Sequence, residues 1–276
     1  MTRETICFIG GGNMAASLVA GLIADGHEPR GLLISDPDRA KLDNLAARFG
    51  VRTTADNTTA VRDAAVVLLC VKPQMARAVC QTLAPALLRP APLIISVMAG
   101  IREHSIQAWL GGSVPLVRAM PNTPAMIQAG AIVLHASPEV TDSQRNQAET
   151  ILRAGGLTQW VEREELMDAV TALSGSGPAY FFLVMEILEQ TGAELGLDPD
   201  SARLLTIQTA LGAARMAMES SDPPQTLRER VTSPGGTTES ALRTLEEGGF
   251  RDLLAQAVRA AKSRSEELSS LLAEKS

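Results

Sequence analysis

The stretch from Ile6 to Gly26 reads ICFIGGGNMAASLVAGLIADG, and it predicts a strand, a tight glycine turn and a helix. Four apolar residues run into three glycines, and apolar residues then recur at helical spacing. Gly10, Gly12 and Ala15 fit the G-x-G-x-x-[GA] pattern of a dinucleotide-binding turn. Gly10 permits the turn, Gly12 leaves room for a pyrophosphate, and Ala15 lets the helix pack close to the strand.

The beginning of this helix offers free N–H groups and the positive end of the helix dipole to phosphates. An ordinary glycine-rich turn is the alternative interpretation, but the position between a strand and a helix favours the nucleotide site. The residues that we expect to bind the cofactor here are Gly10, Gly11, Gly12, Asn13, Met14 and Ala15.

Composition restricts the classes of protein. The chain has 276 residues, of which 45% are hydrophobic, and its formal net charge is −6. This composition is typical of a globular protein and argues against a nucleic-acid partner. The three cysteines and three histidines show neither C-x-x-C nor metal-ligand spacing, so we expect no metal site. No apolar run approaches the length of a membrane span and no signal peptide is expected, which predicts a cytoplasmic protein.

Strands and helices alternate over the first 160 or so residues, which predicts a doubly wound, Rossmann-type α/β sheet. We expect a dinucleotide-binding domain over residues 1–162 and an all-α domain over residues 163–276. The expected strands lie at residues 6–9, 31–36, 51–54, 64–71, 93–97, 114–120, 131–135 and 157–161.

The end of the second strand bears on the choice of cofactor. Asp36 follows Gly12 by 24 residues, a spacing at which a carboxylate often binds the ribose of NAD. Ser35 and Arg39 favour NADP instead, because small polar and basic groups accommodate the extra phosphate. We expect NADPH to be preferred and NADH to be an alternative. Asn57 lies where an adenine edge is expected, although simple helix capping explains that turn equally well.

Ligands of such sheets bind beyond the carboxyl ends of the strands. Val71, Lys72 and Pro73 follow the fourth strand, so they are expected beside the nicotinamide. Ala99, after the fifth strand, permits close approach of the cofactor. Asn122, in the turn Pro121–Pro124, is a candidate for the nicotinamide amide or ribose, although a structural role is more common for asparagine in such turns.

The second half is expected to be helical. The helices expected at residues 179–195 and 201–218 are apolar on most faces, and such helices must be buried. The half is too small to bury both, so we infer that a second copy of the chain covers them in an intertwined homodimer. Further along, Ser233–Gly236 forms a turn, and Thr237 or Thr238 is expected to cap the next helix. That helix start would suit a small carboxylate, although an ordinary capped helix is the commoner explanation.

Five motifs occur over nearly the whole chain: IGGGNMA, VKPQ, MPNTP, DAVTALSGSGPAY and VTSPGGTT. Together they resemble, in order and spacing, the signature of the pyrroline-5-carboxylate reductase family. The resemblance implies hydride transfer from NADPH or NADH to the C=N bond of 1-pyrroline-5-carboxylate, which gives L-proline in the last step of proline biosynthesis. It also implies dimers and, in many members, decamers.

The resemblance places the cofactor on the residues named above and the substrate carboxylate at the turn from Ser233 to Thr238. Thr238 is expected nearest the ring nitrogen, as an orienting donor first and an acid second. Thr238, water and protonation in bulk solution are the alternative sources of the proton on that nitrogen. An iminium is already electrophilic, so positioning is the main catalytic demand. The expected substrate-binding residues are Glu164, Ser176, Val231, Ser233, Gly235, Gly236, Thr237 and Thr238.

Two alternatives remain at this point. The first is another small-substrate reductase of the same two-domain plan. A hydroxyacid dehydrogenase would need a catalytic lysine in the second half, but the segment from Glu164 to Arg259 contains none. The second is a catalytically silent NADP-binding or structural protein, against which both intact turns argue.

Overall fold

The computed structural model describes residues 5–87 and 91–274. Contacts between residues divide the chain into two units: Met1–Ser176 together with Ala261–Ser276, and Gly177–Ala260. The boundary expected at residue 162 follows the change in composition. The contacts instead group residues 163–176, and the residues from Ala261 onward, with the first unit.

The first unit is built on one eight-stranded sheet, in the order β3-β2-β1-β4-β5-β6-β7-β8. All neighbouring strands are parallel except β6 and β7. The order reverses at β1 and β4, as in a doubly wound fold, and all eight expected strands are present. The strands are β1 (Thr5–Ile9), β2 (Leu32–Ser35), β3 (Arg52–Thr54), β4 (Ala64–Leu69), β5 (Leu93–Ser96), β6 (Leu116–Met120), β7 (Gly130–Ala136) and β8 (Gly156–Trp160).

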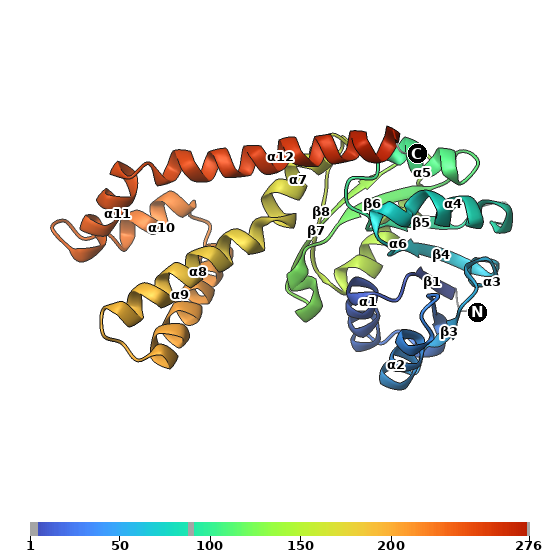
Figure 1. Cartoon of the computed structure of the whole chain (residues 1–276), viewed down its shortest axis with the longest axis horizontal. Helices are drawn as coiled ribbons and strands as arrows, with labels where there is room; N and C mark the ends of the chain where they lie inside the picture. The colour runs from blue at the N-terminus through green and yellow to red at the C-terminus, as the bar shows by residue number, and fades with distance from the viewer. Residues whose placement is uncertain (1–4, 88–90, 275–276) are drawn as a thin grey trace. The chain divides into compact units, whose positions relative to one another are not determined.

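Helices cover both faces of this sheet (Figure 1). The helices of the first unit, with the short turns of 3-10 or π type marked η, are α1 (Asn13–Ala24), η1 (Pro29–Gly31), α2 (Arg39–Phe49), α3 (Asn57–Val61), η2 (Pro73–Met75), α4 (Ala76–Leu83), η3 (Ala84–Ala86), α5 (Glu103–Trp109), η4 (Thr123–Ile127), α6 (Asp142–Arg153), α7 (Leu166–Val170) and η5 (Thr171–Gly175).

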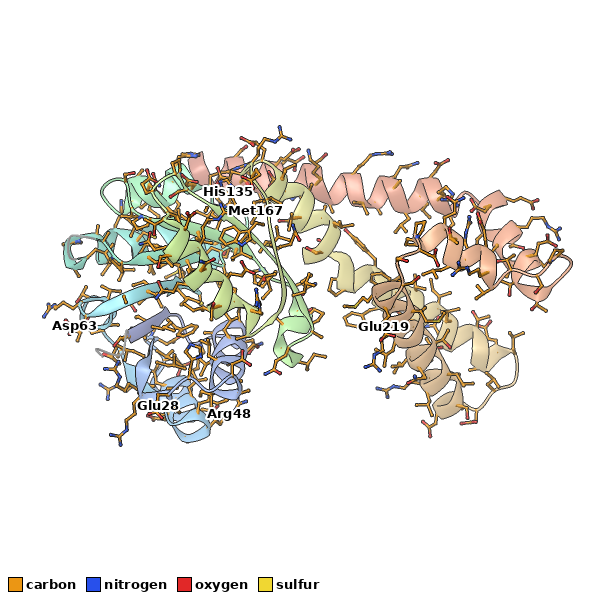
Figure 2. All side chains as sticks on the ribbon, turned by 180° about the vertical axis from the view of Figure 1, so that it is seen from behind. Glu28, Arg48, Asp63, His135, Met167 and Glu219 are labelled. Carbon is orange, nitrogen blue, oxygen red and sulfur yellow. The ribbon has the colours of Figure 1, made fainter. Side chains whose placement is uncertain are left out.

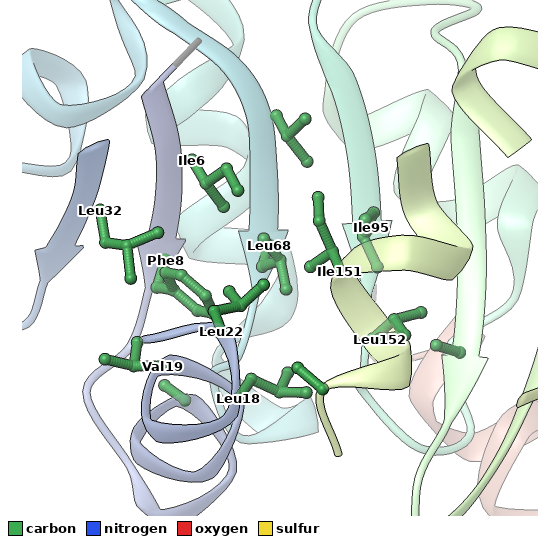
Figure 3. Packing of buried hydrophobic residues seen from close by; sticks show 14 of the residues in the cluster. Ile6, Phe8, Leu18, Val19, Leu22, Leu32, Leu68, Ile95, Ile151 and Leu152 are labelled. Atoms are coloured by element: carbon green, nitrogen blue, oxygen red, sulfur yellow. The ribbon is translucent and has the colours of Figure 1, made fainter. Parts of the chain in front are cut away.

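A layer of apolar side chains fills each face of the sheet. On one face, Leu18 and Leu22 of α1 and Ile151 of α6 pack against strand residues such as Phe8 and Leu68 (Figure 3). These side chains are almost completely buried, so the glycine turn between β1 and α1 rests on a rigid support.

The cysteines belong to these apolar layers. Burial raises the pKa values of the Cys7 and Cys70 thiols to about 12. Both side chains therefore stay protonated at neutral pH and serve as small packing residues.

The second unit is helical. Its elements are α8 (Gly177–Glu194), α9 (Pro199–Glu219), α10 (Pro224–Arg230), α11 (Thr237–Glu247) and the first part of α12 (Phe250–Glu274). The sequence predicted α8, α9 and α11, but not α10, a seven-residue helix whose first residue is the second of two consecutive prolines. The α8 and α9 helices pack against each other, but many of their large apolar side chains are exposed. Those on α8 include Phe181, Phe182, Leu183, Ile187 and Leu188, and those on α9 include Leu204, Leu205 and Leu211.

One continuous helical stretch, Leu166–Glu194, is long and apolar enough to cross a membrane by length and composition. This corrects the expectation that no segment approaches such a span. Many of its polar residues are small and uncharged, so they lower the mean hydropathy little. A single helix of this kind is weak evidence for a membrane. The stretch also contains the exposed apolar residues of α8. Contact with a second copy of the chain explains such an apolar surface more simply than a membrane does.

Candidate functional site

The first glycine of the turn is required by its backbone and its surroundings. Gly10 has a φ of +103°, a conformation that other residues rarely adopt. A Cβ atom at this position would lie 2.6 Å from the carbonyl oxygen of Cys70. The N–H of Gly10 also donates to the Ser35 oxygen at 2.7 Å. Gly10 therefore joins the ends of β1, β2 and β4 closely.

The glycine at position 12 leaves space for a ligand and is not required by the fold. It is the N-cap of α1, and no side chain caps this helix. A Cβ atom on Gly12 would meet nothing within 4 Å, so the protein itself does not need a glycine here. The open space in front of the first turn of α1 fits a dinucleotide pyrophosphate. Ala15 is fully buried against the core, as expected for close packing of helix and strand.

The end of β2 is held by polar contacts within the protein. One oxygen of Asp36 accepts the Gly11 N–H at 2.9 Å, and the other accepts the Asp38 N–H at 2.9 Å. The Ser35 hydroxyl donates to the Asn57 side-chain oxygen at 2.6 Å. The Asp36 carboxylate, which the sequence suggests as a ribose ligand, therefore already holds the glycine turn in place.

A hollow of about 400 Å³ lies beside this turn. Gly12 and Asn13 line it on one side, and Lys41 and Arg48 of α2 line it on the other. Arg48 is labelled on α2 in Figure 2. Lys41 Nζ lies 3.8 Å from the Asp36 carboxylate. Sequence reasoning chose Arg39 as the cation near the ribose, but Lys41 and Arg48 line the hollow. Lys41 and Arg48 are two helical turns apart in α2 and lie on one face of that helix. This spacing was the signal available in the sequence.

A second cavity, of about 660 Å³, lies beyond the carboxyl ends of β4 and β5. Pro73 and Ala99 line it, as does Ser176. Val71 and Lys72 immediately precede Pro73 on the same connection. The residues expected at the nicotinamide end are therefore grouped at one edge of the sheet, as the strand-end rule requires.

Ser176 follows a turn with unusual winding. The segment Thr171–Gly175 is a π turn, in which the Ser176 N–H donates to the Thr171 oxygen at 2.8 Å. Such turns are often found at functional sites.

Asn122 has structural partners within the first unit. Its side-chain oxygen accepts the Ala131 N–H at 2.9 Å, and its nitrogen donates to the Ser174 oxygen at 3.0 Å. These bonds tie the turn after β6 to β7 and to η5. One amide hydrogen remains for a ligand, so contact with the cofactor stays a prediction.

Glu164 is the anchor of a charged cluster that sequence reasoning missed. Its carboxylate pairs with Arg118 of β6 and accepts the Glu103 N–H at 2.6 Å. Burial alone would raise the pKa of the Glu164 carboxyl, but Arg118 and this N–H hold it below its usual range. Burial and the nearby Glu164 raise the pKa of Glu103. An arginine inside the apolar strand LVRAM was the available signal, because a buried guanidinium needs a partner.

The turn expected to hold the substrate carboxylate lies in the second unit, between α10 and α11. Val231 directly follows α10, and the Gly236 N–H donates to the Ser233 oxygen at 3.0 Å. Gly235 has a φ of +73°, and its N–H donates to the Glu239 carboxylate at 2.7 Å. These bonds shape the turn at the beginning of α11.

The cap of α11 differs from the expectation. Gly236 is the N-cap, and neither threonine caps the helix with its side chain. Thr237 and Thr238 are instead the first residues of α11. Their hydroxyls are therefore not used as caps, which leaves the substrate role of this turn as a prediction.

Comparisons with known proteins cover both units. Residues 164–268 match the family model described as pyrroline-5-carboxylate reductase dimerisation, and residues 5–100 match one described as NADP oxidoreductase coenzyme F420-dependent. The pyrroline-5-carboxylate reductase of Pseudomonas aeruginosa is 49% identical over 99% of both chains. That of Pasteurella multocida is 42% identical over 98% of this chain and 100% of its own.

Solved structures agree with these relatives. A pyrroline-5-carboxylate reductase from Coxiella burnetii is 46% identical, with a TM-score of 0.92 over 97% of this chain and 99% of its own. The pyrroline carboxylate reductase of Plasmodium falciparum, with NADP bound, is 27% identical, with a TM-score of 0.86 over 98% of this chain and 99% of its own.

The doubly wound sheet, the open glycine turn and the separate helical unit define a pyridine-nucleotide-dependent oxidoreductase. The extent and identity of the matches place it more narrowly. The chain belongs to the pyrroline-5-carboxylate reductase family.

Proposed function

We propose that this enzyme reduces 1-pyrroline-5-carboxylate to L-proline, the last step of proline biosynthesis, with NADPH as the hydride donor. The observation that carries the cofactor part of the proposal is the open space in front of Gly12, where a Cβ atom would meet nothing within 4 Å. It lies at a helix start that is suited to the pyrophosphate. Family membership over nearly the whole chain supports the choice of substrate.

The chain's own residues bind and orient the two reactants. The cofactor binds along Gly10–Ala15, Ser35, Asn57 and the β4 and β5 ends, and a bound nicotinamide supplies the hydride. The turn from Ser233 to Thr238 binds the substrate carboxylate through N–H groups at the beginning of α11.

Hydride transfer forms a C–H bond at the imine carbon, while the C=N π electrons become the lone pair of a ring nitrogen that is already protonated. The Thr238 hydroxyl orients that nitrogen. No strong acid is required, because the protonated imine is already electrophilic. Positioning of the imine carbon against the nicotinamide ring is therefore the main catalytic demand.

NADPH is the preferred donor, and NADH is an alternative one. The support is the hollow beside the glycine turn, where two cations, Lys41 and Arg48, are available to a 2′-phosphate. Asp36 is occupied by Gly11 and Asp38, so it adds little preference for an unphosphorylated ribose.

The working form is an intertwined homodimer in the cytoplasm, with a decamer as a further assembly. The support is the family model for dimerisation, which spans residues 164–268, and the exposed apolar side chains of α8 and α9.

The decisive experiment follows NADPH oxidation by the purified chain with 1-pyrroline-5-carboxylate, with NADH in parallel and proline identified as product. We expect rapid oxidation, proline in equal amount and faster turnover with NADPH. Tight NADPH binding without turnover would refute the proposed substrate and favour another cyclic imine or a silent binder.

A further inference from the structure

The last turns of the chain return to the dinucleotide-binding unit. From Ala261 onward, the residues of α12 have their contacts with the first unit. Figure 1 shows this end of α12, at the label C, beside α5, and Leu272 packs against the apolar cluster that contains Ile106 of α5. Contact of this segment with the sheet is therefore part of the fold of the first unit.

A buried polar contact fixes the segment. The Ser265 hydroxyl donates to one Asp168 oxygen at 2.7 Å, across 97 residues of sequence. The other Asp168 oxygen accepts from Arg102 at 2.6 Å. Ser265 and Asp168 are only 6% and 5% exposed, so their hydrogen bonds compete little with water.

The same segment forms a wall of the cavity at the β4 and β5 ends. Pro73 and Ala99 line the strand side of this cavity, and Leu268 and Leu271 line the helix side. All of them lie in the first unit. Leu268 and Leu271 are 41% and 43% exposed, although they are large and apolar. A flat, weakly polar ring is the kind of ligand that suits such a wall.

We propose that the end of α12 is part of the cofactor site. Leu268 packs against the nicotinamide half of NADPH, and Ser265 is a positioning residue that holds the helix in place through Asp168 and Arg102. The wall also keeps water from the ring during hydride transfer. The inference rests on the proposed function only in its choice of cofactor.

The test compares two ligands that share the adenosine half. NADPH fills both halves of the site, whereas adenosine 2′,5′-bisphosphate lacks the nicotinamide. Leu268→Trp places a bulkier side chain in the cavity beside the expected ring, so we expect its Kd for NADPH to rise about tenfold or more, which corresponds to the loss of one good contact. Its Kd for the bisphosphate should stay within about twofold of the wild type. Ser263→Trp, at an exposed position of the same helix outside the cavity lining, is the matched control and should change neither Kd.

Unchanged NADPH affinity in Leu268→Trp would overturn the proposal. If that variant loses the bisphosphate as well, the smaller change Leu268→Ala decides. It must weaken NADPH and spare the bisphosphate, or the proposal fails. These measurements follow cofactor binding and do not require turnover of 1-pyrroline-5-carboxylate. An error in the proposed substrate would therefore appear only in the NADPH oxidation experiment.

The positioning role has its own readout. Ser265→Ala removes the bond to Asp168, and we expect it to raise the ratio of the NADPH Kd to the bisphosphate Kd several-fold. The control is Ser270→Ala, an exposed serine of the same helix that bonds the Glu266 oxygen of that helix. A purely structural role would lower the unfolding temperature of Ser265→Ala without moving the ratio, and that outcome would refute the positioning role.

Discussion

Gly10 and Gly12 are two residues apart in one turn, yet they are needed for opposite reasons. Gly10→Ala places a side chain at positive φ and against the Cys70 carbonyl, so it should lower the free energy of unfolding by about 3 kcal/mol. Gly12→Ala enters open space at a φ of −77° and should lower the free energy of unfolding by less than about 1 kcal/mol, because alanine is a poorer N-cap than glycine, while it weakens NADPH binding. Urea unfolding and NADPH titration of both variants separate the two effects. Equal loss of stability in both would contradict this assignment.

Lys41 should matter to the 2′-phosphate alone. Its ammonium group lines the hollow beside the glycine turn, and the 2′-phosphate is the only difference between NADPH and NADH. Lys41→Gln should raise KM for NADPH about tenfold, the cost of one phosphate contact, and leave KM for NADH unchanged. Arg39→Gln, also exposed on α2 but outside the hollow lining, is the matched comparison. A larger effect of Arg39→Gln on NADPH would restore the sequence-based choice.

Among the elements, β6 and the segment before α7 are joined by the Arg118–Glu164 pair. The Arg118 and Glu164 side chains are 7% and 19% exposed, so Glu164→Gln leaves a buried charge and should cost about 3 kcal/mol at pH 7. The pKa of Glu164 is lowered in the folded protein. Its contribution is therefore complete above its ordinary pKa of 4.5 and is lost as the pH falls through the folded value.

Unfolding free energies measured from pH 7 downward should show the difference in stability between wild type and Glu164→Gln shrinking once the pH falls below 4.5. Glu266→Gln breaks an exposed pair with Lys262 and should cost less than about 1 kcal/mol at any pH. A wild-type advantage over Glu164→Gln that does not shrink as the pH falls below 4.5 would show that charge pairing is not its source.

The elements themselves were largely predictable, and the links between them were not. Every strand could be located because buried parallel strands are short apolar runs bounded by turns. The partners in the cluster, by contrast, are separated by 46 residues for Arg118 and Glu164 and by 97 for Asp168 and Ser265. Local patterns carry no information at that range. The function of Asp36 was ambiguous for the same reason, since its partner Gly11 is 25 residues away.

At the scale of the whole molecule, the helical unit is incomplete as a single chain. Phe181 and Phe182 of α8 are 68% and 61% exposed, and Leu204 of α9 is 68% exposed. Burial of apolar area of this kind between two copies of the chain is favourable. Wild-type protein should therefore sediment at no less than twice the chain mass. Its unfolding temperature should rise with concentration, because association stabilises the folded state.

Phe182→Glu should abolish this assembly or render the chain insoluble, because a carboxylate would be buried at the interface without a partner. Arg62→Glu, an exposed change in the first unit, should leave mass and unfolding temperature as in the wild type. A soluble Phe182→Glu protein of unchanged mass would show that α8 lies outside the interface. A wild-type monomer at every concentration would leave the apolar face of α8 and α9 without a second copy to cover it, and the membrane alternative raised by the stretch Leu166–Glu194 would then need a direct test with lipid vesicles.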